Sequence, residues 1–354
     1  MSTRAVKYLL PFSVFALAAL SFTRTGFFTW LPLAYTFGLI PLVELFLKPD
    51  PANMDATEEE LKRNDPLYDM LLYAVVPLQF LCLWLFLTSI DDIGITRWDL
   101  AGRVLSMGLL CGVFGINVAH ELGHRVKPFE RSLAKCLLLT SLYMHFYIEH
   151  NKGHHRNVAT PKDPSTARLS QSLYAFWAQS VPGTFLSAWR ISTDEAAKKG
   201  VWMPKLFNEM AFFQVIQAAA VASVYAIFGW KATVCFVAAA LMGGLLLESV
   251  NYIEHYGLTR KPSGDKGFER VKPEHSWNSD HVLGRLLLFE LSRHSDHHYL
   301  ASRKYQILRH FDEAPQMPTG YPGMILLALV PPAWFHVMHR ELRARESGSL
   351  PVAR

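Results

Sequence analysis

Cysteine is scarce in this chain of 354 residues, and no two of its four cysteines form a Cys-x-x-Cys pair. Cys82, Cys111, Cys136 and Cys235 all lie in apolar runs, where cysteine behaves as a small hydrophobic residue. The sequence therefore predicts no disulfide framework, no zinc ribbon and no iron–sulfur centre. It also contains no flavin or nicotinamide fingerprint, no haem motif and no nucleic-acid-binding motif.

Charged residues are nearly absent from six long apolar stretches. A helix needs about 20 mainly apolar residues to cross a hydrocarbon layer of about 30 Å, and these stretches reach or approach that length. The first stretch lacks a small-residue cleavage motif after it, which indicates an anchor and not a removed signal peptide. We therefore predict an all-α integral membrane protein whose six transmembrane helices lie near Tyr8–Phe22, Phe27–Leu47, Tyr68–Ser89, Leu100–Val118, Ala211–Phe228 and Ala232–Ile253.

Lysine and arginine are scarce in the short connections between these helices. Six crossings would place both termini and all the long connecting pieces on one side of the membrane. The long pieces hold nearly all the Lys and Arg, so the positive-inside rule places them in the cytoplasm. The net charge of +5 follows from this bias and requires no nucleic-acid partner. We expect one membrane-embedded domain over residues 1–354, with a cytoplasmic helical cap.

Histidine, by contrast, is concentrated in motifs. His150, His154 and His155 follow one another at i, i+4 and i+5. On an α-helix His150 and His154 would share a face and converge on one point, while His155 could reach a second point nearby. His120 and His124 form a second i, i+4 pair. Imidazole is the commonest biological metal ligand, so both motifs indicate metal binding.

Two later segments also contain histidines that indicate metal binding. His255 ends the last predicted membrane helix, and His294, His297 and His298 are placed at i, i+3 and i+4. Nine clustered histidines are too many for one metal ion and suit two. Imidazoles without sulfur ligands favour iron over copper(I). We therefore predict a histidine-rich dimetal site in the cytoplasmic cap.

Metal-bound histidines usually need a hydrogen-bond partner for their other ring nitrogen. Polar residues beside the motifs are candidates for that role: Glu121, Glu149, Asp163, Glu248, Asn251, Glu254 and Asp296. Aromatic residues of the predicted membrane helices could line an apolar substrate channel: Tyr35, Phe37, Trp84, Phe114 and Phe213.

The segments His120–His124, His150–His155 and His294–His298 resemble the three histidine boxes of the membrane desaturase and hydroxylase superfamily. A further string, Asn251–Gly257, resembles the extra box of integral-membrane alkane 1-monooxygenases and of their xylene monooxygenase relatives. The string His155–Pro164 also fits that family. The similarity extends from about Asn117 to Tyr305, and the fourth box makes it specific.

This resemblance implies a non-haem diiron enzyme of the bacterial inner membrane, with both termini and the active site in the cytoplasm. The nine histidines would hold two irons, and the chemistry would take place there without a separate acid or base. The expected reaction uses O2 to hydroxylate medium-chain n-alkanes to 1-alkanols. Electrons would come from rubredoxin, an acidic protein that is separate or a removed fusion, with rubredoxin reductase upstream.

Two other functions stay open at this point. A related membrane diiron enzyme would act as an aromatic-methyl (xylene) hydroxylase or as a lipid desaturase. A protein of another class would bind metal in the membrane without catalysis. Product identity and metal content would distinguish these functions.

Overall fold

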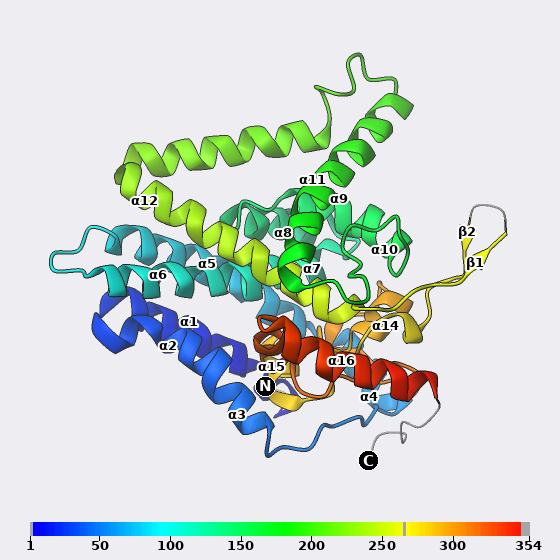
Figure 1. Ribbon diagram of the computed structural model, residues 1–354. Helices are drawn as coiled ribbons and strands as arrows, with labels where there is room; N and C mark the ends of the chain where they lie inside the picture. Colours follow the sequence, from blue (N-terminus) through cyan, green and yellow to red (C-terminus); the bar gives the residue numbers. More distant parts are fainter. Residues whose placement is uncertain (1–2, 265–266, 348–354) are drawn as a thin grey trace. The chain divides into compact units, whose positions relative to one another are not determined.

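The computed structural model describes residues 3–264 and 267–347, and helices account for most of them (Figure 1). Within these described ranges the only strands are β1 (Pro262–Ser263) and β2 (Gly267–Phe268), which pair antiparallel. The prediction of an all-α membrane protein is therefore confirmed.

The first part of the described chain contains helices α1 to α8, most of them apolar. Their bounds are α1 (Leu10–Thr23), α2 (Leu31–Leu33), α3 (Ile40–Glu44), α4 (Ala56–Asn64), α5 (Pro66–Ser89), α6 (Arg97–Leu110), α7 (Asn117–Gly123) and α8 (Pro128–Thr140). Short 3₁₀ segments cover Thr3–Leu9 and Gly26–Trp30, and π-helical segments cover Ala34–Leu39 and Cys111–Ile116.

The second part combines two long helices with many short ones. Their bounds are α9 (His145–Glu149), α10 (His155–Asn157), α11 (Leu173–Lys198), α12 (Glu209–His255), α13 (Val282–Leu287), α14 (His294–Tyr299), α15 (Tyr321–Ala328) and α16 (Pro331–Glu346). A π-helical segment covers His150–His154, and 3₁₀ turns cover Pro273–His275 and Tyr305–Ile307.

Five helical stretches of the described chain are long and apolar enough to cross a membrane: Ala5–Thr23, Gly26–Glu44, Pro66–Ser89, Arg97–Gly123 and Glu209–His255. The last has 47 residues, or about 70 Å of helix at ~1.5 Å per residue, which is twice a hydrocarbon layer. It breaks at Gly229, whose φ of 79° suits glycine, and Figure 1 shows α12 turning back there. Its two arms match the last two predicted spans, while the total of six crossings stays a prediction.

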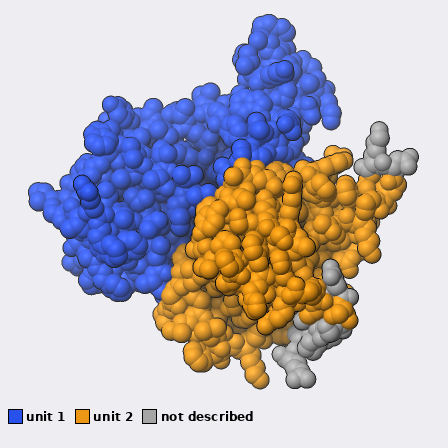
Figure 2. All heavy atoms as spheres, viewed as in Figure 1, with its two compact units in different colours: residues 1–36, 66–153, 181–247 blue, residues 37–65, 154–180, 248–354 orange. Residues whose placement is uncertain are grey.

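The chain divides into two compact units (Figure 2). Unit 1 comprises the described residues of 1–36, 66–153 and 181–247, and unit 2 those of 37–65, 154–180 and 248–354. Both units are built from segments far apart in the sequence. The prediction of a single domain over residues 1–354 stays a prediction.

Unit 1 is a bundle of apolar helices that contains the buried cation Arg103. Phe15 of α1 packs on Phe114 with ring centroids 4.4 Å apart. Arg103 is buried, and it donates to the carbonyl oxygens of Ser21 (3.2 Å) and Arg24 (3.0 Å) at the end of α1. Charges inside apolar helices persist when such partners satisfy them, so Arg103 ties α6 to the end of α1.

In unit 2, buried carboxylates connect short helices to other segments through hydrogen bonds. Glu59 of α4 accepts hydrogen bonds from Arg303 (3.1 Å) and from Nε of Arg309 (3.0 Å). Glu44, at the end of α3, accepts from the backbone N–H of Gly284 at 2.7 Å, near the start of α13. Carboxylates are favourable near helix N-termini, where backbone N–H groups are free. These contacts fix the segments on either side of α14, which carries the last histidine motif.

Candidate metal centre

Four histidines from three motifs lie together inside unit 2. His154, His255, His294 and His298 are all buried, and one ligand nitrogen of each lies within 4.8 Å of those of the others. Nε2 of His154 is 3.2 Å from Nε2 of His298, and Nε2 of His294 is 3.3 Å from Nε2 of His255. We call these four residues the quartet.

The spacing of the quartet suits a metal ion. Histidine nitrogens bind a metal such as zinc at about 2.0–2.1 Å, so two of them on one ion at 90–110° are about 2.8–3.4 Å apart. Burial, followed by the neighbouring histidines, holds the pKa of His298 well below its ordinary value, so its ring stays neutral. Neutral imidazoles whose nitrogens face one another have lone pairs that a cation satisfies. The quartet could therefore hold a metal.

Asp163 contacts the ring nitrogen of His154 that is not part of the quartet. Its Oδ2 lies 2.9 Å from Nδ1 of His154, and its side chain is fully buried. Thr166 donates to the same oxygen at 2.6 Å, and the N–H of Ser165 donates to Oδ1 at 3.1 Å. With Nδ1 protonated toward the carboxylate, the neutral ring presents the Nε2 lone pair to the quartet. This is the carboxylate–histidine arrangement found behind many metal ligands.

Glu254 occupies a different position from Asp163. Its Oε2 lies 3.2 Å from Nε2 of His294, on the side where the quartet nitrogens converge. Its Oε1 accepts a hydrogen bond from the Tyr321 hydroxyl at 2.8 Å. Burial, together with this carboxyl group, raises the pKa of Tyr321 well above its usual range, so the hydroxyl remains a donor. Tyr321 has no signal in the sequence, because it lies far from every motif.

Three more histidines approach one another inside unit 1, and we call them the trio. Ring centroids are 4.9 Å apart between His120 and His124, 4.4 Å between His120 and His150, and 5.1 Å between His124 and His150. Nε2 of His150 is 3.1 Å from Nε2 of His124. Phe146 stacks on the His150 ring at 4.7 Å and fixes its orientation. The i, i+4 prediction for His120 and His124 matches this geometry.

The remaining two clustered histidines form a pair inside unit 2. Nε2 of His155 lies 3.1 Å from Nε2 of His297. The i, i+4 spacing predicted that His150 and His154 could converge on one point, and the two belong to different groups, the trio and the quartet. That prediction assumed an α-helix, whereas His150–His154 is π-helical, with i→i+5 hydrogen bonds in place of i→i+4 bonds.

The other predicted supporting residues contact charged or polar partners. Glu121 pairs with Arg125 at 2.5 Å, and Glu149 accepts from the Ser187 hydroxyl at 3.2 Å. Three further supporting candidates lie in unit 2. Glu248 accepts from the Asn251 amide at 3.2 Å, and Asp296 pairs with Nε of Arg303 at 3.0 Å and accepts from the N–H of Arg309 at 2.8 Å.

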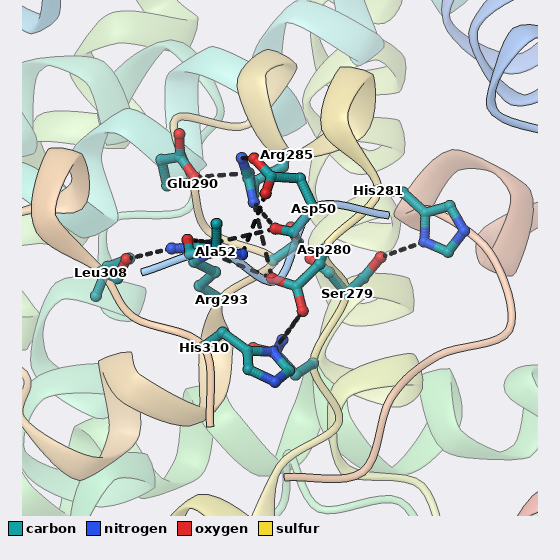
Figure 3. A network of polar contacts seen from close by, with 12 residues as sticks. Asp50, Ala52, Ser279, Asp280, His281, Arg285, Glu290, Arg293, Leu308 and His310 are labelled. Carbon is teal, nitrogen blue, oxygen red and sulfur yellow. Dashed lines mark hydrogen bonds and ion pairs between the residues drawn. The ribbon is translucent and has the colours of Figure 1, made fainter. Parts of the chain in front are cut away.

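A buried network of charged groups braces the segment that leads into His294 (Figure 3). Arg293 donates from Nε to Asp280 at 3.3 Å, and from its terminal nitrogens to the carbonyl of Leu308 at 2.8 Å and to two carbonyls of the loop before α4. Asp280 also accepts from Nδ1 of His310 at 2.6 Å, which raises the pKa of that histidine. Arg293 thereby fixes the start of α14. Sequence reasoning missed this network because its members belong to no motif.

The five aromatic channel candidates have varied surroundings. Phe114 and Phe213 are buried, whereas Trp84 is 56% exposed and packs against Phe228. Tyr35 accepts a hydrogen bond from Ser13 at 3.1 Å, and Phe37 is half-buried. Their role in a substrate channel stays a prediction.

A match to a known protein family defines the class to which this protein belongs. Residues 98–328 match the fatty acid desaturase family, and this stretch covers more than half of the chain and all nine clustered histidines. The class is therefore that of membrane desaturases and hydroxylases.

Relatives that match most of the chain assign it to a smaller group within this class. The chain is 41% identical to alkane 1-monooxygenase 2 of Pseudomonas aeruginosa over 324 residues, which cover 90% of this chain and 85% of the relative. It is 39% identical to alkane 1-monooxygenase 1 of Alcanivorax borkumensis over 315 residues, covering 88% and 78%. The hydroxylase component of the xylene/toluene monooxygenase of Pseudomonas putida is 28% identical over 332 residues, covering 93% and 86%. The chain belongs to the fatty acid desaturase family and, within it, to the alkane 1-monooxygenases.

Proposed function

We propose that this chain catalyses the terminal hydroxylation of medium-chain n-alkanes to 1-alkanols with O2. The observation that carries the proposal is the grouping of the clustered histidines in a chain about 40% identical to several alkane 1-monooxygenases. The apolar helices agree with a substrate that dissolves in the bilayer.

We propose two non-haem irons as the metals and the nine histidines as their ligands. The quartet would hold one iron. The other five, His120, His124, His150, His155 and His297, are the proposed ligands of the second. When bound, an iron pair supplies reductive activation of O2, which neutral imidazole ligands permit without placing extra negative charge near lipid.

The protein's own residues would prepare the site for this chemistry. Asp163 holds His154 in the tautomer that binds metal, and Glu254 stands beside His294 with one oxygen held by Tyr321. Burial of the quartet excludes bulk water, which would otherwise compete for metal positions. No separate acid or base is assigned.

The electron donor is proposed to be rubredoxin, an acidic protein that receives its electrons from a rubredoxin reductase. Its partner surface would be the Lys- and Arg-rich face, since charge complementarity speeds encounter. We place the chain in the bacterial inner membrane as a single catalytic domain, with both termini and the site in the cytoplasm. The distribution of basic residues supports this orientation.

The test is to feed octane and ¹⁸O-labelled O2 to the purified chain with iron, rubredoxin, rubredoxin reductase and NADH. We expect 1-octanol that carries the label. An octene would indicate a desaturase instead. Hydroxylation of p-xylene but not of octane would indicate an aromatic-methyl hydroxylase, and no oxygen uptake with either would indicate a non-catalytic metal-binding protein.

A further inference from the structure

Two adjoining open cavities are formed by residues of unit 1, beside the broken helix α12. The smaller has a volume of about 240 Å³ and reaches from the turn between α8 and α9 to α11 and the second arm of α12. The larger, of about 650 Å³, follows the first arm of α12. Both are lined by Leu142, Gln214 and Gln217, so they meet at one shared wall. Their residues include none of the nine clustered histidines.

Most of the lining is apolar, and both cavities open onto the surface of unit 1. Phe185, Val237 and Leu241 line the smaller cavity, and Tyr225 lines the larger one. Leu241 is 57% exposed and Tyr225 is 61% exposed, although both lie on a helix that is apolar enough to cross the membrane. Ligand sites of about 300–1,000 Å³ with apolar walls suit molecules of this character, here a flexible alkyl chain.

The shared wall is polar, which is unusual inside a membrane helix. Gln217 accepts from the N–H of Met144 at 3.0 Å and donates to Oε1 of Gln214 at 3.4 Å. The amide nitrogen of Gln214 has the sulfur of Met210 as its acceptor, at 3.8 Å, and a thioether is a weak acceptor. Polar residues of membrane helices mark functional sites by default. Gln214 therefore offers a hydrogen-bond donor beside the cavities.

The same wall includes a strained turn. Leu142 has a φ of 49°, in the left-handed region that a branched side chain rarely adopts. The turn is held by the Tyr143 N–H, which donates to the carbonyl of Leu138 at 3.1 Å, and by Gln217 at Met144. Strain of this kind persists where the surroundings enforce it, often at ligand sites. This turn leads directly into α9, which ends one residue before His150 of the trio.

We propose that the two cavities bind the primary alcohol formed by the proposed reaction, before it passes into the bilayer. The alkyl chain would lie along the apolar walls, and the hydroxyl would accept from the Gln214 amide while donating to a glutamine oxygen. An alkane offers neither a donor nor an acceptor, so it would leave that amide without a strong partner. The inference rests on the proposed function for the identity of the alcohol, but binding itself needs neither iron nor turnover.

The test uses a 1-octanol analogue with a diazirine near the end of its chain, photolysed with the full chain in lipid nanodiscs. We expect labelled peptides within residues 141–145 and 214–245, and protection by excess 1-octanol but not by octane. Labelling confined to other segments would overturn the proposal. Equal protection by octane would assign the cavities to the substrate, and protection by added phospholipid alone would assign them to lipid, and either result overturns it.

Two variants sharpen the test. Gln214→Leu should raise the 1-octanol concentration needed for protection about tenfold, because the hydroxyl loses its donor. Ala218→Phe, which fills the larger cavity without changing a polar group, should abolish labelling there. The matched control is Ser223→Ala on the same arm, whose hydroxyl donates to the carbonyl of Ala219 at 2.8 Å and lines neither cavity. Unchanged protection in Gln214→Leu would refute recognition of the hydroxyl.

Discussion

Replacing the carboxylate behind His154 should weaken metal binding in the quartet while leaving the fold intact. In Asp163→Asn the neutral amide oxygen still fits 2.9 Å from Nδ1, but the hydrogen bond loses its charge. Charge-assisted hydrogen bonds are about twice as strong as neutral ones. Such supporting residues typically contribute 10–100-fold to metal affinity. We therefore expect a loss of about 1.4–2.7 kcal/mol of binding free energy.

The assay is a titration of the iron-loaded, purified chain with a competing chelator at fixed pH, following the iron that remains bound. Thr166→Val is the matched control, since it removes the hydroxyl that donates to Asp163 at 2.6 Å but keeps the carboxylate. We expect the control to lose less than half as much binding free energy as Asp163→Asn. The reasoning is refuted if Asp163→Asn holds iron as tightly as the unaltered chain, or if both variants lose iron equally.

The remaining predictions concern the proposed metal ligands and the buried network of Asp280, Arg293 and His310. His154→Ala should lose iron and activity, whereas His336→Ala, outside every histidine group, should keep both in the same iron and product assays; equal losses would contradict the ligand assignment. Asp280→Ala should lower the free energy of unfolding by about 3–5 kcal/mol, because it removes the buried carboxylate that pairs with Arg293 and His310. Asp312→Ala, at an exposed carboxylate, should cost far less in the same detergent denaturation series. The hydrogen bond that His310 donates to Asp280 raises the pKa of His310, so the contribution of this contact to stability is complete below about pH 6.5 and is lost as pH rises through the raised value. As pH rises above about 6.5, the melting temperature of His310→Gln should fall less than that of the unaltered chain. Identical pH profiles of the two would contradict this role of His310.

Local spacing in the sequence predicted much of the candidate site. His294 and His298, at i and i+4 on α14, both belong to the quartet, and His120 and His124 both belong to the trio. Asp163 lies within ten residues of His154, close enough for motif reasoning to single it out. The long apolar runs likewise indicated the membrane helices, because burial in lipid imposes a composition that sequence alone reveals.

Other features depend on structure that no local pattern encodes. The segment His150–His154 is π-helical, whereas the periodicity argument assumed a regular α-helix. Tyr321 reaches Glu254 from 67 residues away, and Asp280 reaches Arg293 through a folded loop. Such contacts are made by the tertiary fold, so a single sequence does not reveal them.

The iron content of the purified, full-length chain tests the central claim most directly. The proposed diiron centre predicts two irons per chain by elemental analysis, with little zinc or copper. One metal ion per chain, or two zinc ions retained after iron loading, would contradict the diiron centre and the hydroxylase activity proposed from it.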